Sequence, residues 1–166
     1  VQDIDIATSA RPEQVMELFP KVIPTGIKHG TVTVRCNGVS FEVTTFRRES
    51  GYSDHRHPDQ IDFVDDIRID LGRRDFTINA LAMDQSGKII DPYHGQVDLR
   101  NKLIRAVGDP LRRFTEDPLR ILRGIRFSAH LGFRIHPNTW RAMKECGYLL
   151  HEISKERIHA EWSKIV

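Results

Sequence analysis

Two aspartates lie one residue apart near the start of the chain, in the run Asp3-Ile4-Asp5-Ile6. Successive side chains of a strand point to opposite faces, so we expect Asp3 and Asp5 to share one face while the isoleucines face a core. Two carboxylates held this close repel, and a bridging divalent cation relieves the repulsion. Such a pair can hold the metal ions used in phosphoryl or nucleotidyl transfer. A solvated edge strand with alternating polar residues is the alternative that this run leaves open.

Glu42 lies between two apolar residues and supplies a third candidate carboxylate. On a strand beside the two aspartates it would complete or support a two-metal site. The alternative is an ion pair with an arginine such as Arg47 or Arg74. Lys28 directly precedes a His-Gly turn and could contact a triphosphate, although a simple exposed turn explains it equally well.

The run Arg73-Arg74-Asp75 places two cations and an acid just before an expected helix. A helix N-terminus offers free amides and the positive end of a dipole, so together with two arginines it suits a phosphate. Asp75 can accept a hydrogen bond from a hydroxyl such as that of a ribose. The alternative is an Arg-Asp capping arrangement without any ligand, and the density of the run favours ligand binding.

A second block of charged residues contains Glu116, Asp117, Arg120 and Arg123. The last three are spaced three apart, which places them on one helical face. A carboxylate and a guanidinium together can bind the edge of a base, because Asp accepts from an exocyclic amine and Arg donates in a fork. A ladder of salt bridges within the helix is the alternative, and for this block taken alone the ladder is favoured.

Cations outnumber acids between residues 100 and 134, although the formal net charge of the whole chain is only +2. That charge does not by itself indicate a nucleic-acid partner. The two cysteines, Cys36 and Cys146, show no metal-ligand spacing, which predicts reduced thiols in a cytoplasmic protein. No apolar run reaches membrane-spanning length and no signal peptide is recognisable, so we expect no membrane partner.

In the first half of the chain, alternating apolar and polar residues predict a small antiparallel sheet with one helix. Asn37-Gly38 is the strongest hairpin signal and joins two of the strands. Residues 47–60 have no period and are rich in polar and turn residues, so we expect a mobile loop. The expected elements are strands at 3–7, 31–36, 40–46 and 88–91, a helix beginning near Pro12, and helices at 65–71 and 77–83.

From Gln96 onward the pattern predicts an almost wholly helical chain. Asp117-Pro118 is typical of an N-cap followed by a first helical turn, and apolar residues then recur at helical spacing. Residues 138–150 and 154–166 add two more amphipathic helices. We therefore expect an α+β protein with a catalytic head at 1–92 and a helical neck at 93–166. Both ends stop in mid-element, which suggests a chain that is incomplete on both sides.

Taken in order, six segments resemble the motifs of the bacterial CCA-adding tRNA nucleotidyltransferase and poly(A) polymerase family. The resemblance is specific, because several spaced motifs occur in the family's order, and it covers essentially the whole chain. It implies a small polymerase-β-like nucleotidyltransferase sheet with helices, followed by an all-helical neck. The segments are residues 3–8, 41–47, 73–80, 91–99, 116–123 and 154–162.

The resemblance also implies roles for particular residues. Asp3 and Asp5 match the metal-binding carboxylates, with Glu42 as a candidate third catalytic acid. The arginines and aspartate of 73–75 match a motif that contacts sugar and phosphates, and the block at 116–123 matches one in which an Asp and an Arg pair with the incoming base. Together with Lys28, the expected nucleotide-binding residues are Arg73, Arg74, Asp75, Asn79, Glu116, Asp117, Arg120 and Arg123.

The remaining segments carry expectations of another kind. Residues 91–99 match a segment that links head to neck, and residues 156–162 match a motif of mainly structural role. Residues 47–60 correspond to a flexible loop linked to the switch from C to A addition. The family's glycine turn that cradles the triphosphate precedes its Asp-x-Asp, and its helical body follows the neck, so we expect both to lie outside these residues.

The function implied by the resemblance is addition of C and A to the 3′ end of tRNA from CTP and ATP, with Mg²⁺ as cofactor. The alternatives within this class are a poly(A) polymerase and a specialist that adds only CC or only A. An alternative of another class is a non-catalytic RNA-binding module that has kept the fold.

Overall fold

The structure is a computed structural model that describes residues 4–55 and 57–165. Its backbone contacts divide the chain into two compact units. Unit 1 holds the described residues up to Ser50 together with Gln60–Asp70, and unit 2 holds Gly51–Asp59 and the described residues from Leu71 onward. The division into domains at residue 92 stays a prediction.

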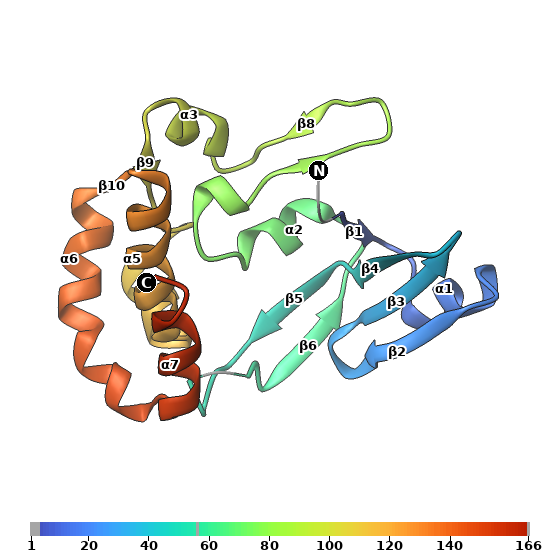
Figure 1. Cartoon of the computed structure of the whole chain (residues 1–166), viewed down its shortest axis with the longest axis horizontal. Coiled ribbons are helices and arrows are strands. Elements are labelled where there is room, and N and C mark those ends of the chain that lie inside the picture. Colours follow the sequence, from blue (N-terminus) through green and yellow to red (C-terminus); the bar gives the residue numbers. More distant parts are fainter. Residues whose placement is uncertain (1–3, 56, 166) are drawn as a thin grey trace. The chain divides into compact units, whose positions relative to one another are not determined.

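Unit 1 is built on a four-stranded sheet in the order β1-β4-β3-β2 (Figure 1). β3 is antiparallel to both β4 and β2, as predicted, whereas β1 runs parallel to β4. The predicted antiparallel sheet is therefore confirmed for these three strands. β1 joins them in parallel at the edge, after which the chain passes through a helix and two further strands before it reaches β4. The strands are β1 Asp5–Thr8, β2 Val22–Gly26, β3 Thr31–Cys36 and β4 Val39–Thr45.

The hairpin between β3 and β4 turns at Asn37-Gly38, as predicted. Both residues have positive φ, 50° for Asn37 and 81° for Gly38, which is the conformation that a two-residue turn of type I′ requires. This turn fixes the register of β3 against β4, in which Thr33 lies opposite Glu42. The hairpin signal therefore determines which side chains of the two strands share a face.

Helix α1, Pro12–Leu18, covers one face of this sheet. Its Val15 packs with Val32, Val34 and Val43 in the buried cluster of unit 1. Ile4 and Ile6 of the opening run remain 55% and 41% exposed, so their expected burial was wrong. The buried cluster is centred on β3 and β4, whereas β1 lies at the edge of the sheet.

Residues 47–60 were expected to be a mobile loop, and that prediction was wrong at both ends. β5, Arg47–Ser50, and β6, Gln60–Phe63, form an antiparallel pair. The half-buried positions of β5 carry Arg47 and Glu49, which bind each other at 2.6 Å with side chains only 14% and 7% exposed. A buried ion pair thus replaces the apolar residues whose alternation would have revealed the strand.

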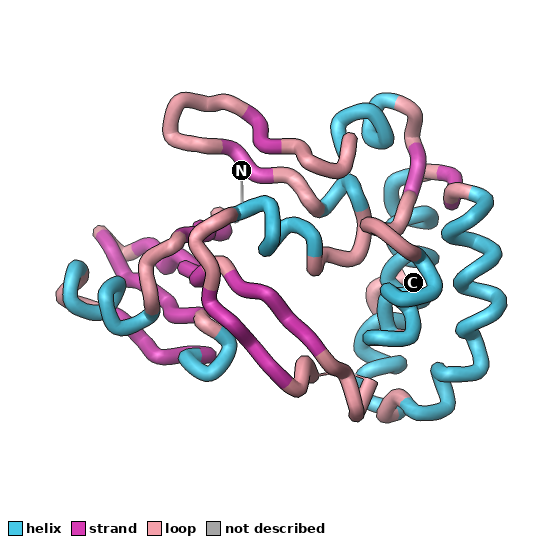
Figure 2. The backbone as a smooth tube through the Cα atoms, turned by 180° about the vertical axis from the view of Figure 1, so that it is seen from behind, coloured by secondary structure: helices cyan, strands magenta, loops and turns pink. Residues whose placement is uncertain are grey.

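Unit 2 is mainly helical, but short strands interrupt the helices (Figure 2). Two-residue strands at 103–104 and 134–135 form a parallel pair that the sequence did not predict. Within the described residues, no helix is long and apolar enough to cross a lipid bilayer. The elements after α2, Ile67–Gly72, are η2 Thr77–Asn79, β7 Ala82–Met83, β8 Ile89–Ile90, α3 Gly95–Arg100, β9 Leu103–Ile104, α4 Pro110–Glu116, α5 Leu119–Leu131, β10 Arg134–Ile135, α6 Pro137–Cys146, η3 Gly147–Glu152 and α7 Lys155–Trp162.

The predicted helix at 77–83 was wrong. Only the turn η2 is helical there, and Ala82–Met83 pairs with Ile89–Ile90 as a hairpin. The reason lies in contacts with a distant segment, because the Thr77 amide donates to the Arg105 carbonyl at 2.9 Å and the neighbouring Phe76 pairs with Ala106. These long-range bonds hold the backbone extended where local periodicity indicated a helix.

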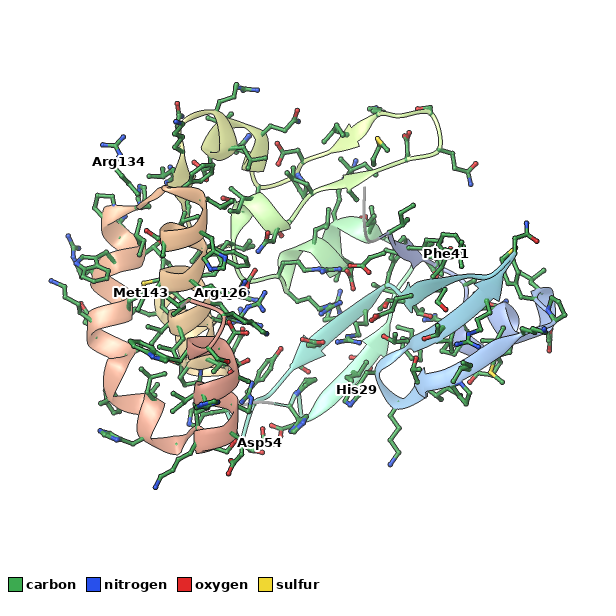
Figure 3. All side chains as sticks on the ribbon, viewed as in Figure 1. His29, Phe41, Asp54, Arg126, Arg134 and Met143 are labelled. Carbon is green, nitrogen blue, oxygen red and sulfur yellow. The ribbon has the colours of Figure 1, made fainter. Side chains whose placement is uncertain are left out.

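The core of unit 2 gathers around Phe76 and Phe114, both fully buried, and helix α6 closes it with Met143 (Figure 3). Gly124 of α5 lies directly under this residue, since a Cβ at position 124 would clash with the Met143 methyl group and the Phe76 ring. The glycine therefore permits close packing of α5 on the core.

Residues 51–59 belong to unit 2 although they lie between two strands of unit 1. His55 fixes this segment, because its Nδ1 donates to the Thr115 carbonyl at 2.6 Å and its Nε2 lies 3.2 Å from the Glu152 carboxylate. Gly51 has a φ of +67°, and a Cβ there would meet the Asp59 carboxylate. The described residues of this segment are thus a structured part of unit 2.

Candidate functional site

The polar face of the unit 1 sheet carries two carboxylates side by side. Asp5 of β1 is the register partner of Glu42 in the parallel strand β4, and both residues are exposed. Neighbouring strands lie about 4.8 Å apart, and register partners point to the same face. Asp3, the other half of the predicted pair, lies outside the described residues. The third candidate acid thus lies where it can act with Asp5.

Hydroxyl groups continue this row across the sheet. Thr33 of β3 is the register partner of Glu42, and its Oγ1 lies 3.1 Å from the Oγ1 of Thr25. One step along the strands, the Oγ1 atoms of Thr31 and Thr44 lie 3.1 Å apart. Within the described residues Glu42 forms no ion pair, so the alternative partners Arg47 and Arg74 do not hold it.

These carboxylates suit a hard divalent cation. Carboxylate oxygens are the ligands that Mg²⁺ prefers, and it is commonly held by one or two protein carboxylates together with substrate phosphates and water. The described residues contain no group of three or more His, Cys, Asp and Glu side chains that could hold a metal by themselves. The donor set therefore fits an ion that shares its ligands with a substrate.

Lys28 lies in the turn η1, Ile27–His29, between β2 and β3. The following Gly30 has a φ of +78°, and its amide donates to the Ile27 carbonyl at 2.9 Å. Lys28 is exposed. Its contact with a triphosphate stays a prediction.

In unit 2, Asp75 is nearly buried and its carboxylate is fully engaged. Oδ2 accepts from Arg123 Nε at 2.7 Å, and Oδ1 accepts from the Phe76 amide at 2.8 Å and from Asn79 Nδ2 at 3.2 Å. The side chain of Asp75 is 7% exposed and that of Arg123 is 34% exposed. Three of the expected nucleotide-binding residues therefore come together, and Asp75 holds Arg123 rather than presenting a free acceptor.

Glu116 gathers three arginines around one carboxylate. It lies 3.0 Å from Arg112, 3.3 Å from Arg113 and 3.1 Å from Arg120. Burial lowers the pKa of the Arg113 guanidinium, and the charge of Glu116 partly offsets this effect. Arg120 points inward, 9% exposed, and its Nη2 donates to the Arg73 carbonyl at 3.3 Å. The ladder predicted among Asp117, Arg120 and Arg123 within one helix was wrong, because each of the three pairs with a residue outside that set. Glu116 of α4 instead joins arginines of α4 and α5.

Asp117 caps helix α5, as predicted. Its Oδ1 accepts from the Leu119 amide at 3.1 Å. The two carboxylate oxygens also accept from Arg157 Nη2 of α7, at 3.4 and 3.3 Å. The Asp117 side chain remains 17% exposed. Its position is therefore set by its own helix and by α7 together.

Glu161 of α7 is buried beside two arginines of α5 (Figure 3 labels Arg126). It accepts from Arg126 Nε at 2.8 Å and lies 4.0 Å from Arg123. Burial opposes the charge on Glu161, but the hydrogen bond and charge of Arg126, aided by Lys164, outweigh it and lower the Glu161 pKa. The guanidinium carbons of Arg126 and Arg123 lie 4.5 and 5.4 Å from the Phe127 ring centroid.

Two residues of α7, Arg157 and Glu161, hold side chains of α5 and its cap, although the sequence analysis gave their segment only a structural role. Arg157 and Glu161 lie in the segment 154–162, which the sequence singled out as a motif. Their partners, Asp117 and Arg126, lie 40 and 35 residues away, so no helical spacing connects them. Segment 91–99 also acts locally, because the Asp91 carboxylate accepts from the amides of Gly95 and Gln96 and so caps α3.

Comparison with known proteins shows to which family a chain with this arrangement belongs. Residues 1–105 match the poly(A) polymerase head domain. This chain belongs to the bacterial CCA-adding enzyme and poly(A) polymerase family. Residues 132–166 match a second description, the probable RNA and SrmB-binding site of polymerase A. Family membership implies use of a divalent metal ion, in agreement with the donor set on the sheet.

Curated relatives carry the name CCA-adding enzyme. The one from Lactobacillus helveticus is 56% identical over 165 residues, which are 99% of this chain and 41% of the relative. The one from Oceanobacillus iheyensis is also 56% identical over 165 residues, with the same coverage. The chain thus spans about two fifths of the length of these relatives.

Solved structures agree with the sequence comparison. The CCA-adding enzyme of Bacillus stearothermophilus in complex with CTP is 47% identical, with a TM-score of 0.91, and the match covers 99% of this chain and 40% of that one. A tRNA nucleotidyltransferase complexed with a primer tRNA and an incoming ATP analogue is 32% identical, with a TM-score of 0.78. That match covers 98% of this chain and 47% of the other. The predicted nucleotidyltransferase fold is confirmed.

Proposed function

We propose that the protein is a tRNA nucleotidyltransferase that adds C and A to the 3′ end of tRNA from CTP and ATP. The carrying observation is the register of Asp5 against Glu42 on adjacent parallel strands, which leaves two carboxylates exposed without an ion-pair partner in the described residues. The names of the relatives and the bound CTP and ATP analogue of the solved structures support the choice of substrates.

In this proposal Asp5 and Glu42, with Asp3, hold Mg²⁺. Mg²⁺ held there would lower the pKa of the attacking hydroxyl and stabilise the negative charge on the leaving pyrophosphate. The 3′-hydroxyl of the tRNA releases its proton to solvent, and its oxygen forms a bond with the α-phosphorus as the bond to pyrophosphate breaks. Catalysis comes from position and charge. The protein would act in the cytoplasm, where tRNA and the nucleotides are found.

The residues of unit 2 supply nucleotide recognition. Asp117 accepts from the exocyclic amine that cytosine and adenine share and that uracil and guanine lack at that edge. Arg73 and Arg74 contact the phosphates, and Asn79, which donates to Asp75, completes the set of nucleotide-binding residues in this segment. Arg120, Arg123, Asp75 and Glu116 form the ion-pair network described above, and in this role they position the recognition residues.

The test supplies purified protein with tRNA that ends at the discriminator base and with each nucleotide in turn. We expect addition of C, C and A, and loss of addition by the isosteric variant Asp5→Asn with an unchanged far-ultraviolet circular dichroism spectrum. Glu13→Gln is the matched control, because Glu13 is an exposed acid on α1, across the sheet from Asp5. Normal addition by Asp5→Asn would refute the proposal.

A poly(A) polymerase is the second candidate, favoured by the description of the matched head domain. The same assay separates the two, because a polymerase of this kind extends the RNA with many A residues. A product of only CC or only A would indicate a specialist. RNA binding without any addition would indicate the non-catalytic module.

A further inference from the structure

The polar face of the unit 1 sheet carries cations as well as carboxylates. Val34 of β3 and Val22 of β2 are register partners on the core face. One residue further, the Arg35 amide donates to the Lys21 carbonyl at 2.9 Å, so these two residues continue the pairing. Because successive side chains of a strand alternate between faces, Arg35 and Lys21 share the polar face. Both residues are exposed.

This basic pair, Lys21 and Arg35, lies diagonally beside the carboxylates. Arg35 is the register partner of Ser40 in β4, two residues before Glu42, and Glu42 in turn pairs with Asp5. Diagonal neighbours on adjacent strands are about 7 to 8 Å apart, which is within reach of a long side chain. A positive pair across β2 and β3 therefore adjoins a negative pair across β4 and β1, on one face of one sheet (Figure 1).

The two pairs do not neutralise each other. Within the described residues, the basic pair forms no salt bridge with Asp5, with Glu42 or with any other acid. Like charges placed opposite each other on two strands destabilise a sheet, and this face retains one such pair of each sign. The arrangement suits a ligand that brings phosphate oxygens and a divalent cation together, because the carboxylates bind the cation and the basic pair binds the phosphate.

We propose that Lys21 and Arg35 form a binding site for a substrate phosphate next to the Asp5 and Glu42 carboxylates. The inference rests on the proposed function, which brings both the last phosphodiester of the RNA and the triphosphate of the nucleotide to this face of the sheet. Access to the basic pair follows from the same requirement. The Arg35 guanidinium donates two parallel hydrogen bonds to phosphate oxygens, and the Lys21 ammonium adds a point charge. Neither residue lies in a segment that resembles a family motif.

The experiment compares the intact protein with its double variant Lys21→Gln/Arg35→Gln. The KM for tRNA and the KM for CTP, each measured with the other substrate saturating, identify which substrate supplies the phosphate. If it is the RNA, we expect the KM for tRNA to rise about tenfold or more, and the slope of log affinity against log salt to become shallower by about 1.4 to 1.8. If it is the triphosphate, the KM for CTP should rise about tenfold or more instead. In both cases kcat at saturation should stay unchanged, because the contact serves binding.

Two further variants separate the site from charge in general. The matched control Lys88→Gln/Arg100→Gln removes the same charge from exposed positions of unit 2 and should leave both KM values unchanged. Arg35→Lys keeps the charge but loses the two-pronged hydrogen bond, so it should raise the affected KM less than Arg35→Gln does. Thermal melting should show the double variant to be as stable as the wild type or more stable, because repulsion within the basic pair is relieved.

Unchanged KM values for both substrates in the double variant would overturn the proposal, and a lower melting temperature in that case would show that the pair supports the sheet instead. Binding assays distinguish this failure from failure of the proposed function. Fluorescence anisotropy of labelled tRNA and displacement of a fluorescent nucleotide by inorganic triphosphate both measure affinity without nucleotide addition. If the wild type adds C and A but the double variant keeps both affinities, the site assignment alone is wrong. If the variant loses affinity but the wild type adds no nucleotide, the phosphate site stands and the enzymatic proposal fails.

Discussion

The carboxylates that matter most have opposite environments in the two units. In unit 1, Asp5 and Glu42 lie side by side, exposed and without an ion pair in the described residues. In unit 2, Asp75 and Glu161 are buried, and each accepts a guanidinium hydrogen bond of 2.7 to 2.8 Å. Adjacent like charges destabilise a fold, whereas buried pairs depend on each other. The first arrangement suits a ligand that supplies the missing charge, and the second suits a rigid support.

The comparison predicts which property each substitution changes. Removal of a charge from the sheet face should impair chemistry and leave stability intact or improved. Removal of a charge from the helical unit should reduce stability first and selectivity as a consequence. Variants in both units, measured for unfolding and for activity, test this separation.

The largest effect is expected at Glu42. Glu42→Gln keeps the shape of the side chain and removes its charge. Nucleotide addition should therefore fall on the order of a hundredfold, which corresponds to about 2.7 kcal/mol of transition-state stabilisation. The free energy of unfolding should stay constant or rise, because repulsion from Asp5 is relieved. Urea denaturation and a single-turnover assay measure the two quantities. A large loss of stability would show that Glu42 stabilises unit 1, which contradicts the proposed difference between the two units.

At Asp75 the order of effects should reverse. Asp75→Asn leaves Arg123 without its carboxylate, so we expect a loss of about 2 to 3 kcal/mol in the free energy of unfolding. Activity should fall because less of the protein is folded and because Arg123 is no longer held in place by Asp75. If Asp75→Asn is as stable as wild type but inactive, the aspartate contacts substrate directly, and the positioning role is wrong.

Glu161 gives a prediction for pH. Because its pKa is lowered in the folded state, its contribution to stability is complete at neutral pH and is lost as the pH falls through the lowered value. Glu161→Gln should therefore cost about 2 kcal/mol at pH 7, and the difference from wild type should shrink below about pH 4. Lys164→Gln is the control, since Lys164 is 57% exposed and its pair with Glu161 should contribute little.

Asp117 allows a test of whether unit 2 also determines which nucleotides are preferred. Asp117→Ala removes the acceptor for the exocyclic amine, so the preference for CTP and ATP over UTP and GTP should fall about tenfold. Arg157→Ala should reduce the same preference less, because it frees the carboxylate without removing it. Competition among the four nucleotides measures the ratio. Unchanged selectivity in both variants would separate this aspartate from base recognition.

The smallest effect is expected at Gly51. Gly51→Ala forces a side chain into positive φ and against Asp59, which should cost about 1 kcal/mol or slightly more. Gly38→Ala is the matched control, because Gly38 has a similar φ and open space around the added Cβ. Thermal melting of both variants separates the clash from the backbone cost. Equal losses would show that the approach to Asp59 is unimportant.

Features set by short-range chemistry were predictable from the sequence. The Asn37-Gly38 turn and the Asp117 cap depend on residues within a few positions, and both occur as expected. Glu42 was also placed correctly on a strand beside that of Asp5, because alternation fixes which face a strand residue uses.

Features set by distant partners were not predictable. β5 escaped detection because its inward positions hold Arg47 and Glu49, which look like loop residues in the sequence. Asp75 and Arg123 lie 48 positions apart in the sequence, so neither helical nor strand spacing could predict that they pair. Arg120 shares a helical spacing with Arg123, yet the packing of α5 turns it inward. At Arg47, Glu49 and Arg120 a charged side chain occupies an inward position of a strand or helix, where the periodic pattern would predict an apolar residue.

The segment 51–59 has a consequence for biosynthesis. His55 leaves the ribosome 60 residues before Thr115, the residue whose carbonyl it binds, while β5 and β6 on either side of the segment can already pair. During translation the contact of His55 with Thr115 therefore cannot form until α4 has been synthesised, although β5 and β6 can pair earlier. A recombinant fragment that begins at Leu71 would lack this tip, and the surface around Thr115 and Glu152 would have to be covered by water instead.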